Sequence, residues 1–598
     1  MFISQVRIKG FRNFQDATIN FNQKSLIIGP NEVGKTNLIH ALRILLDRTL
    51  SDSDIEPLDS DFYAGVDTHN ISVLLKFEQV TEEPILSKMK GYVSDNGIMY
   101  LEYRATRDSE THSKNYSFLA GHDPDMMEEI TERYYRRVLH LKYISSKRDM
   151  KSFIKKEKKN LFINAKDERN DEIRDHDLNT RSEIEENLNL VNSKIRKLSF
   201  IKNSTTQLNE VLNDLSFHHS DKKVIFDVVG QDVDSFIENV ELTSNYNGKN
   251  LVISGDGRNN QIVLALWSTQ NKIATKNNFE TIVYCIEEPE SHLHPHQQRK
   301  LADYLSKEID GQTIITTHSP QITSGFSPNS IIRLKQNNYT TTAASNGCSK
   351  IIEDAWQSFG YRMSIIPAEA FFSDFVFLVE GPSEVQFYHA LAKVNNIDLD
   401  RYNISILMVG GIGFEVFIQI LNAMEIAWII KTDNDIFKVP NKKSEEEYRF
   451  AGIERIIKYY SSYCIDGKNN GEFVLQDPMT IPHFNEKYNP PTELLSKVRE
   501  IKIKAEKKGI FLSDEDLEKD ILNSDIKDNV LTSLDCCSCE EALKLMQEAK
   551  ADFMFKFLLD NQDCLKKLRN SSFMKPIKYI IEMICNGNNT DESTRKSN

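Results

Sequence analysis

Blocks of apolar residues near the start of the chain predict several strands and one amphipathic helix. Strands are expected where apolar residues alternate with polar ones or run continuously, at 2–11, 16–22, 24–29, 71–78 and 98–104. Residues 37–50 instead place Leu38, Leu42 and Leu45 on one helical face. This pattern predicts an α/β unit in the first part of the chain.

A change of composition interrupts this first unit. Residues 147–223 are charged and polar, with helix-like stretches but no heptad seam sustained over several turns. We interpret this segment as a helical insertion with a role in dimerisation. Globular patterning returns at 224 and continues to 345. The first unit is therefore expected to consist of 1–146 and 224–345.

Strands and helices alternate again within residues 370–585. Apolar runs such as FVFLV, ISILMV and AWIIKT are separated by helical stretches such as SEVQFYHALAK. This alternation is typical of βαβ units and predicts a second α/β domain with a parallel sheet. The last residues, 586–598, are polar and are expected to form a disordered tail.

The composition indicates a multidomain globular protein whose charge does not favour nucleic acid. The 598 residues are 40% hydrophobic and 27% charged, with a net charge of −14. An acidic protein would contact DNA through a local basic surface or through bound metal ions. The opening residues lack the apolar stretch of a signal peptide, and no apolar run reaches the length of a membrane span. We expect a cytoplasmic protein without a membrane partner.

A glycine-rich loop between the third strand and the helix predicts a nucleotide site. The stretch SLIIGPNEVGKTN matches the pattern G-x-x-x-x-G-K-[ST], in which backbone N–H groups cradle phosphates. Lys35 would reach the terminal phosphates and Thr36 would bind Mg²⁺. The candidate ATP-binding residues of this loop are Gly29, Asn31, Gly34, Lys35 and Thr36.

Further candidate nucleotide residues follow two later apolar strands. TIVYCIEEPE ends in Glu287 and Glu288; the first would hold Mg²⁺ through water and the second would polarise an attacking water. TIITTHSP ends in His318, which would sense the γ-phosphate. A loop resembling the signature loop of ABC-type ATPases lies before these strands, at Ser254, Gly255 and Gly257.

A second group of carboxylates follows the strands of the second domain. Glu380 ends an apolar run, and Glu384 comes one turn into the helix after it. Asp433 and Asp435 end another strand and point the same way, because side chains two residues apart share a face in extended chain. Carboxylates at the carboxyl edge of one sheet can share a pocket only if divalent cations neutralise them. Such a pocket suits phosphodiester cleavage.

These motifs together resemble the OLD (overcoming lysogenisation defect) family. The P-loop, the S-G-x-G loop, the acidic pair and the histidine are similar to the ATPase heads of SMC and RecF proteins. E-G-x-x-E followed by D-x-D resembles the TOPRIM pattern. A head followed by TOPRIM is the OLD architecture, and the chain looks most like the nucleases of Gabija anti-phage systems. The resemblance implies an ABC-type ATPase head with a helical dimerisation insertion, followed by a TOPRIM domain.

The resemblance also implies activity, cofactors and partners. We expect a DNA endonuclease that takes Mg²⁺ or Mn²⁺ in the TOPRIM site and ATP with Mg²⁺ in the head. Bound nucleotide is expected to restrain cleavage. The implied partners are double-stranded DNA, further copies of this chain in a head dimer and a homotetramer, and a helicase of the UvrD type.

Three later residues complete the site by this resemblance alone. Asp516 and Glu518 are implied as further metal ligands and Lys550 as a catalytic residue, although each lies in a charged stretch where a solvated helix face is the usual alternative. The stretch EEALKLMQEAKADFMFKFLL reads as one helix with Lys550 between Met546 and Phe553 on its apolar side. The implied metal ligands are Glu380, Glu384, Asp433, Asp435, Asp516 and Glu518.

Two other functions remain open from the residues. TOPRIM domains also serve topoisomerases, and the 21 tyrosines of this chain exclude no nucleophile by number, although no topoisomerase-like tyrosine domain is apparent. The alternative of a RecF- or SMC-type repair ATPase with a vestigial TOPRIM is disfavoured by the intact set of carboxylates.

Overall fold

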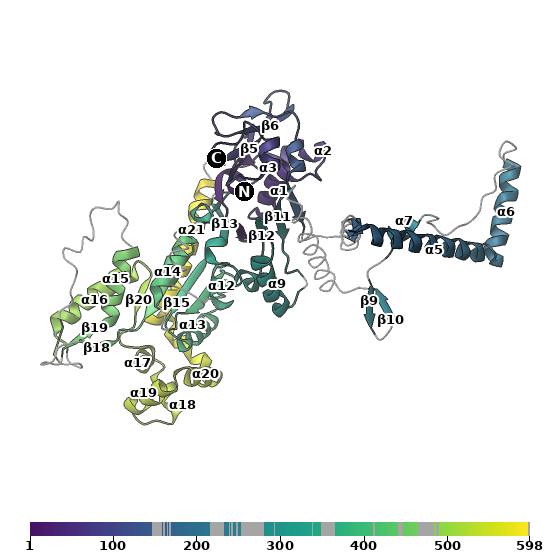
Figure 1. Cartoon of the computed structure of the whole chain (residues 1–598). Helices are drawn as coiled ribbons and strands as arrows, with labels where there is room; N and C mark the ends of the chain where they lie inside the picture. Colours follow the sequence, from purple (N-terminus) through teal and green to yellow (C-terminus); the bar gives the residue numbers. More distant parts are fainter. Residues whose placement is uncertain are drawn as a thin grey trace.

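The computed structural model describes two α/β units joined by continuous core packing, with a helical arm on the first (Figure 1). The described residues are 1–145, 169–215, 280–291, 293–337, 339–348, 365–410, 413–439, 447–463, 483–485 and 490–595, with short pieces between 158 and 166 and between 233 and 252. None of the helices in these ranges is long and apolar enough to cross a membrane.

The first unit, the head, contains two sheets of six strands. The antiparallel sheet has the order β2-β1-β4-β5-β6-β7, and the mixed sheet has the order β14-β13-β3-β12-β11-β8. The antiparallel sheet consists of β1 (Phe2–Phe11), β2 (Phe14–Asn20), β4 (Asn70–Glu78), β5 (Met99–Arg107), β6 (Lys114–Gly121) and β7 (Glu128–Glu129). The mixed sheet consists of β3 (Lys24–Ile28), β8 (Leu139–Ile144), β11 (Thr281–Glu287), β12 (Thr313–Thr316), β13 (Ile331–Asn337) and β14 (Thr340–Ala343).

Helix α1 (Lys35–Leu46) lies in the core between these two sheets. Leu38, Leu42 and Leu45 are fully buried, as the helical spacing predicts, and they pack with apolar residues from both sheets. The helix begins at Lys35 and ends before the predicted position 50, because Asp47 turns to extended backbone. The other helices of the head are α2 (Asp52–Ile55), α3 (Glu83–Lys88), α9 (Pro295–Lys307) and α10 (Pro320–Thr323).

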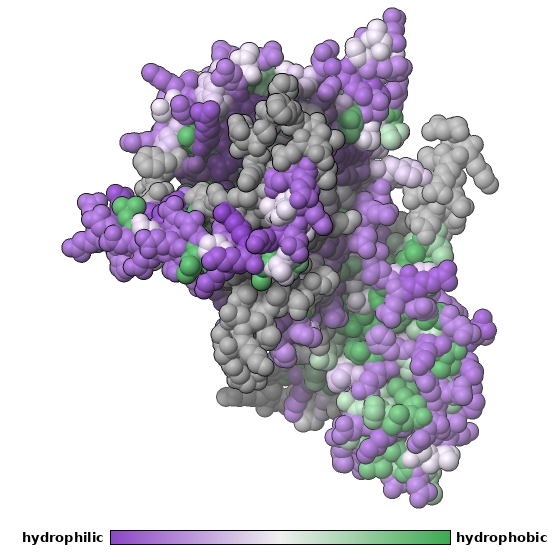
Figure 2. Space-filling view, turned by 90° about the vertical axis from the view of Figure 1, so that its right-hand side faces the viewer, coloured by the Kyte–Doolittle hydropathy of each residue, from purple (hydrophilic) through white to green (hydrophobic). Residues whose placement is uncertain are grey.

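The insertion forms an arm that projects from the head (Figure 1). Its described elements are α5 (Asp171–Ile195) and α6 (Ser199–Leu215). The arm also carries α7 (Val233–Glu238), β9 (Thr243–Tyr246) and β10 (Lys249–Val252), which lie past the expected end of the insertion at 223. Most of the described side chains of α5 are exposed, and Figure 2 shows the arm as largely hydrophilic. Green side chains gather instead on the lower lobe, which belongs to the second unit (Figure 2).

The second unit is built on a parallel sheet in the order β16-β15-β17-β20. Its strands are β15 (Phe375–Val379), β16 (Ile404–Met408), β17 (Ala427–Thr432) and β20 (Ile510–Leu512), and β18 (Ile436–Lys438) pairs with β19 (Tyr448–Phe450). Its helices are α12 (Ile365–Ala370), α13 (Pro382–Val394), α14 (Phe414–Ala423), α15 (Ala451–Tyr463), α16 (Thr492–Glu506), α17 (Leu517–Leu522), α18 (Lys527–Leu534), α19 (Cys539–Glu548), α20 (Lys550–Asn561) and α21 (Lys575–Arg595).

Strand β15 is buried on both faces, which accounts for its continuous apolar run. Phe375, Phe377 and Val379 pack towards α13 and α20, whereas Val376 and Leu378 belong to a core shared with α14 and the head. At the end of the chain, α21 continues to Arg595, so the backbone there is helical beyond the point where a disordered tail is expected.

Arg333 in β13 joins the head to the second unit. Its guanidinium donates to the carbonyls of Ser373 at 3.0 Å, Glu425 at 3.2 Å and Met424 at 3.3 Å. The Ser373 carbonyl lies just before β15, and the other two lie just before β17. Only 6% of Arg333 is exposed, so the contact is part of the interior rather than a surface bridge.

Candidate functional site

The predicted nucleotide loop connects β3 to α1 in a conformation that requires glycine. Gly29 has φ 152° and Gly34 has φ 105°, where other residues are strained. A Cβ atom on Gly34 would lie 2.0 Å from Nδ2 of Asn13, and one on Gly29 would lie 2.6 Å from the Leu334 carbonyl oxygen. Both glycines of the motif are therefore needed for the loop to close against the head.

Two residues that the motif does not include brace this loop. Asn13 donates from Nδ2 to the Val33 carbonyl at 2.7 Å, and Thr341 donates from Oγ1 to the same carbonyl at 2.6 Å. Asn37 in turn donates to Oδ1 of Asn13 at 2.8 Å. Sequence reasoning missed Asn13 and Thr341 because they lie outside the motif, in the turn between β1 and β2 and in β14.

Lys35 is held within the loop and is buried from solvent. Its Nζ donates to the carbonyls of Gly29 at 2.9 Å and Pro30 at 2.7 Å, and the residue is 8% exposed. Burial lowers the pKa of Lys35 to about 8, although Glu288, Glu287 and Glu290 act against this shift. Asn31 and Thr36 are exposed at the mouth of the loop. A bound anion would stabilise the charged form of this lysine.

The predicted acidic pair lies at the carboxyl end of β11, beside this lysine. Glu287 is 4% exposed and accepts a hydrogen bond from the Tyr143 hydroxyl at 2.6 Å, while its Oε1 is buried without a hydrogen-bond partner. Glu288 turns outward with φ 42°, and its Oε1 lies 3.7 Å from Nε2 of His318. Burial and Lys35 lower the pKa of His318, and Glu288 opposes them. Lys35, the acidic pair and His318 thus share one site.

Glu290 is a further residue of this site that the sequence did not single out. It accepts from the Thr317 hydroxyl at 2.7 Å and from the His318 backbone N–H at 2.8 Å. Burial raises its pKa, and these two hydrogen bonds act against the shift. Glu290 thereby fixes the loop that carries His318. The predicted signature loop, Ser254, Gly255 and Gly257, lies outside the described residues.

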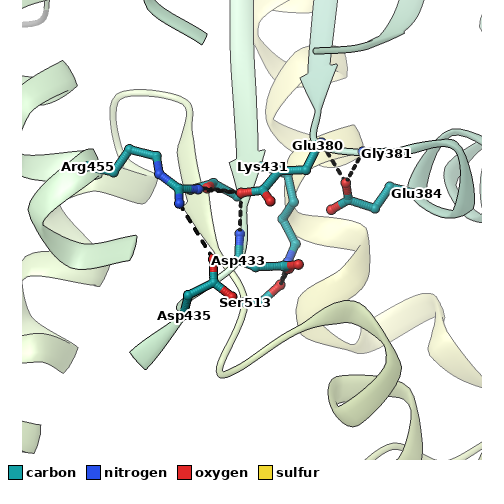
Figure 3. A network of polar contacts seen from close by, with 9 residues as sticks. Glu380, Gly381, Glu384, Lys431, Asp433, Asp435, Arg455 and Ser513 are labelled. Carbon is teal, nitrogen blue, oxygen red and sulfur yellow. Dashed lines mark hydrogen bonds and ion pairs between the residues drawn. The ribbon is translucent and has the colours of Figure 1, made fainter. Parts of the chain in front are cut away.

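The second group of carboxylates gathers at the carboxyl edge of the parallel sheet, as predicted (Figure 3). Glu380 follows β15, and Asp433 and Asp435 follow β17, its neighbour in the sheet. Glu384 caps the start of α13, where its Oε2 accepts from the backbone N–H of Glu380 at 2.6 Å and of Gly381 at 3.0 Å. The other oxygen, Oε1, is buried without a hydrogen-bond partner.

Cations and hydroxyl groups of the protein surround these carboxylates (Figure 3). Arg455 donates to Oε1 of Glu380 and lies 3.6 Å from Oδ2 of Asp435. Ser513 donates to Oδ1 of Asp433 at 3.0 Å and accepts from Lys431. Arg455, Ser513 and Lys431 were not predicted, although a lysine within the buried strand AWIIKT signals a nearby anion.

The carboxylates still lack positive charge. Burial, with help from Asp433, raises the pKa of Glu384 to about 8, and Lys431 only partly opposes this shift. Burial likewise raises the pKa of Asp433 to about 7 against the effect of Lys431. The pKa of Asp435 is raised by burial and by Glu380. A divalent cation would stabilise the charged form of all three.

The donor set fits a divalent cation in its chemistry. Mg²⁺ and Mn²⁺ prefer carboxylate oxygens, and the buried Oε1 of Glu384 has no competing hydrogen bond. Within the described ranges, however, no three acidic, His or Cys side chains stand close enough together to hold an ion as placed. Glu380 is turned to Arg455 and Glu384 to backbone N–H groups. Side-chain rotations at this edge would be needed for joint coordination.

The three residues implied only by resemblance lie beside this cluster. Glu518 in α17 is 2% exposed, and its Oε2 lies 3.1 Å from Nζ of Lys550. Although burial acts in the opposite direction, Glu518, Asp516 and Asp433 raise the pKa of Lys550 and keep it charged. Asp516 caps α17 and accepts from Nε2 of Gln547 at 2.7 Å. The fold therefore brings Lys550 into the field of the carboxylates.

The surroundings of Lys550 differ from the predicted single helix. The chain breaks at Ala549, which has φ −138° and ψ 47°, so α19 ends at Glu548 and α20 begins at Lys550. The Lys550 side chain is 47% exposed, and thus does not lie in the core as its spacing suggested. Lys550 is the first residue of α20, and its ammonium lies at Glu518.

Comparison with known proteins gives the same two parts. Residues 1–83 and 67–323 match the family described as AAA ATPase domain. Residues 371–435 match the family described as overcoming lysogenization defect protein-like, TOPRIM domain. An ATPase head joined to a TOPRIM domain is the class of protein that the two sites define. The chain belongs to the AAA ATPase domain family, and its TOPRIM match confirms the resemblance to the OLD family drawn from the motifs.

Individual proteins are similar to this chain over different shares of its length. Endonuclease GajA of Bacillus cereus (strain VD045) is 26% identical over 493 residues, which cover 78% of this chain and 80% of GajA. The Old nuclease of Escherichia phage P2 is 28% identical over 228 residues, covering 36% of this chain and 37% of that nuclease. Among solved structures, the SMC head bound to the C-terminal winged-helix domain of ScpA matches with a TM-score of 0.37 and 16% identity, over 57% of this chain and 97% of that one.

Proposed function

We propose that this chain is a DNA endonuclease that cleaves phosphodiester bonds at its TOPRIM site with Mg²⁺ or Mn²⁺ and is regulated by ATP bound to the head. The observation that carries the proposal is the placement of Glu380, Glu384 and Asp433 at one sheet edge, with Lys550 brought to the same edge from a distant helix. The similarity to endonuclease GajA over most of both chains supports it.

The residues of the TOPRIM site would divide the work. Glu380, Glu384, Asp433, Asp435, Asp516 and Glu518 would hold the metal ions. The ions, when bound, would activate water and stabilise the charge of the attacking and leaving oxygens. Lys550 is charged and half-exposed, so it can approach a phosphate while Glu518 orients it. Ser513 and Lys431 hold Asp433 from the protein side.

The contact made by Arg333 supports control by the head. Arg333 pairs with Ile28, the last residue of β3 before the nucleotide loop. Its guanidinium holds the amino ends of β15 and β17, whose carboxyl ends lead to Glu380 and Asp433. A shift of the nucleotide loop would thus reach both acidic strands through one buried side chain.

A plasmid assay tests the proposal directly. The pure protein, incubated with supercoiled plasmid and Mg²⁺ or Mn²⁺, is expected to nick or cut it, and chelation is expected to stop the reaction. Added ATP is expected to slow cleavage. Relaxed, religated circles would instead indicate a topoisomerase, and intact plasmid under all metal conditions would contradict nuclease activity.

The regulatory link has its own test. Arg333→Met should retain ATP binding and cleavage but bring the cleavage rates with and without ATP closer together. Lys300→Met, which removes an exposed cation from α9 of the head, is the matched control and should keep the parental ratio. An unchanged ratio in Arg333→Met would show that the signal takes another route.

The wider setting is proposed on the same similarity. The protein would act in anti-phage defence, as a homotetramer assembled through dimers of heads, with a UvrD-like helicase as partner. Loss of nucleotide during infection would release the nuclease. Plating of phage on cells that express the chain with and without a co-expressed UvrD-like helicase, together with mass measurement of the purified protein, would test these points.

A further inference from the structure

The first residues of helix α15 pack against the acidic loop of the TOPRIM site, residues 433–435, which follows β17. The backbone N–H of Ala451 donates to the Asp435 carbonyl at 2.9 Å. A Cβ atom on Gly452 would lie 2.4 Å from the Asp433 carbonyl oxygen and 2.6 Å from Cα of Asn434. Only glycine allows the helix to approach the loop this closely, so the direction of α15 is set by the loop itself.

This approach places Arg455, one turn further along α15, at the carboxylates. Its guanidinium donates to Oε1 of Glu380 and to the Thr432 hydroxyl, and it lies 3.6 Å from Oδ2 of Asp435. The same Glu380 oxygen also accepts from the Asp433 backbone N–H at 3.0 Å. The Arg455 side chain is 26% exposed, so the contact is largely shielded from water.

Arg455 occupies the position of a counter-ion to Glu380 and Asp435. It bridges carboxylates from two neighbouring strands, which a shared divalent cation would otherwise have to do. Among the other cations nearby, Lys458 pairs with Glu415, Arg449 with Glu454 and Lys550 with Glu518, while Lys431 donates to Ser513. Guanidinium keeps its charge at all physiological pH values, so the Arg455 side of this contact does not titrate.

We propose that Arg455 is a positioning residue that occupies Glu380 and Asp435 as an internal counter-ion and competes with the divalent cation for them. The inference rests on the proposed function, because it takes these carboxylates as the metal ligands. Cation binding then requires the guanidinium to release Glu380. Arg455 therefore stabilises the metal-free protein and sets the cation concentration at which the site fills.

Metal binding without DNA or nucleotide is the test. Calorimetry with MnCl₂ on the full chain should show that Arg455→Gln binds Mn²⁺ about fivefold to tenfold more tightly than the parent, because the competing charge is gone. Its metal-free melting temperature should fall, and Mn²⁺ should raise it more than in the parent. Arg455→Lys, which keeps a charge but loses the fork, should lie between the two.

Control variants separate the possible failures. Lys458→Gln removes a cation from the same helix but from a pair outside the site, and should keep the parental Mn²⁺ affinity. Glu380→Gln should lose Mn²⁺ binding; if it binds as the parent does, the proposed metal site itself is wrong. If Glu380→Gln loses binding while Arg455→Gln binds Mn²⁺ equally or more weakly than the parent, the site stands and the competition is overturned. Should Arg455→Gln fail to fold, Arg455→Lys decides the question by the same comparison.

Discussion

The nucleotide site and the TOPRIM site both contain buried charged groups. The nucleotide site lacks negative charge, whereas the TOPRIM site lacks positive charge. In the head, burial lowers the pKa of Lys35 to about 8 in spite of the nearby carboxylates. In the TOPRIM domain, burial raises the pKa of Glu384 to about 8 and of Asp433 to about 7 in spite of Lys431. The first site favours an anion such as a polyphosphate, and the second favours a cation. The sign of the missing charge thus separates the two roles more clearly than overall composition, which is acidic throughout.

Removal of a carboxylate from the TOPRIM site should have the largest effect on cleavage. Asp433→Ala should reduce plasmid cleavage by about 10³-fold or more, since a metal ligand is lost. ATP binding should persist, because the nucleotide site lies in the other unit. Cleavage rates and ATP calorimetry check both halves, with Asp400→Ala as an exposed carboxylate control in the same domain. Parental cleavage by Asp433→Ala would remove the TOPRIM site from the mechanism.

Removal of the Lys550 ammonium from the TOPRIM site should have the next largest effect on cleavage. Lys550→Ala should lower the single-turnover cleavage rate by about 10²–10³-fold while Mn²⁺ and DNA binding persist, because the ammonium acts on charge that develops in the transition state. Lys550→Arg should recover little activity, since a planar fork does not replace a point charge. Lys556→Ala, an exposed lysine of the same helix, is the control. A near-parental rate would return Lys550 to a solvated helix face.

In the head, the corresponding change is Lys35→Ala. It should weaken ATP binding by about 30–100-fold, the effect expected for a charge-assisted contact to phosphate. If bound nucleotide restrains cleavage, this variant should cut DNA at ATP concentrations that silence the parent. Calorimetry with ATP and cleavage across an ATP titration measure the two effects. Equal ATP affinity in the variant and the parent would contradict the assignment of the loop.

The candidate residues that could be predicted from the sequence are those that belong to a short, recognisable motif. Gly29 to Thr36 and the strand ends at Glu380 and Asp433 carry local signals of spacing and burial, and the parallel sheet follows from alternating strands and helices. Glu290 was within reach, because it adjoins the acidic pair in EEPE. Local signals of this kind also predict the α/β fold class of both units.

The residues that escaped prediction reach the sites through tertiary structure. Arg455 contacts Glu380, 75 residues earlier in the chain, because Gly452 lets α15 pack closely against the loop after β17, and Thr341 braces the nucleotide loop from a strand far along the chain. Lys550 was implied by resemblance alone, and its contact depends on a backbone break at Ala549 that the helical spacing concealed. No single-sequence pattern reports such contacts between distant segments.

The smallest expected effect is a pH dependence of stability in the metal-free protein. Because the folded protein holds a proton on Glu384 up to about pH 8, it binds more protons than the unfolded chain between the ordinary carboxyl pKa and that value. Stability should therefore fall as the pH rises through this range. Glu384→Gln cannot ionise, so its melting temperature should fall less over the same range, and the readout is the difference between the two proteins in chelator.

This difference isolates Glu384 from groups that titrate the other way. Burial lowers the pKa of His40 and His140 to about 4, so these residues make the fold more stable as the pH rises towards 6.5 in both proteins. Lys35, with its pKa near 8, contributes mainly above that value. Mn²⁺ binds the ionised carboxylates, so it should stabilise the parent more at pH 8 than at pH 6 and stabilise Glu384→Gln less. Equal pH slopes for the two metal-free proteins would mean that Glu384 is ionised in the fold, and that the TOPRIM site already holds enough positive charge without a metal ion.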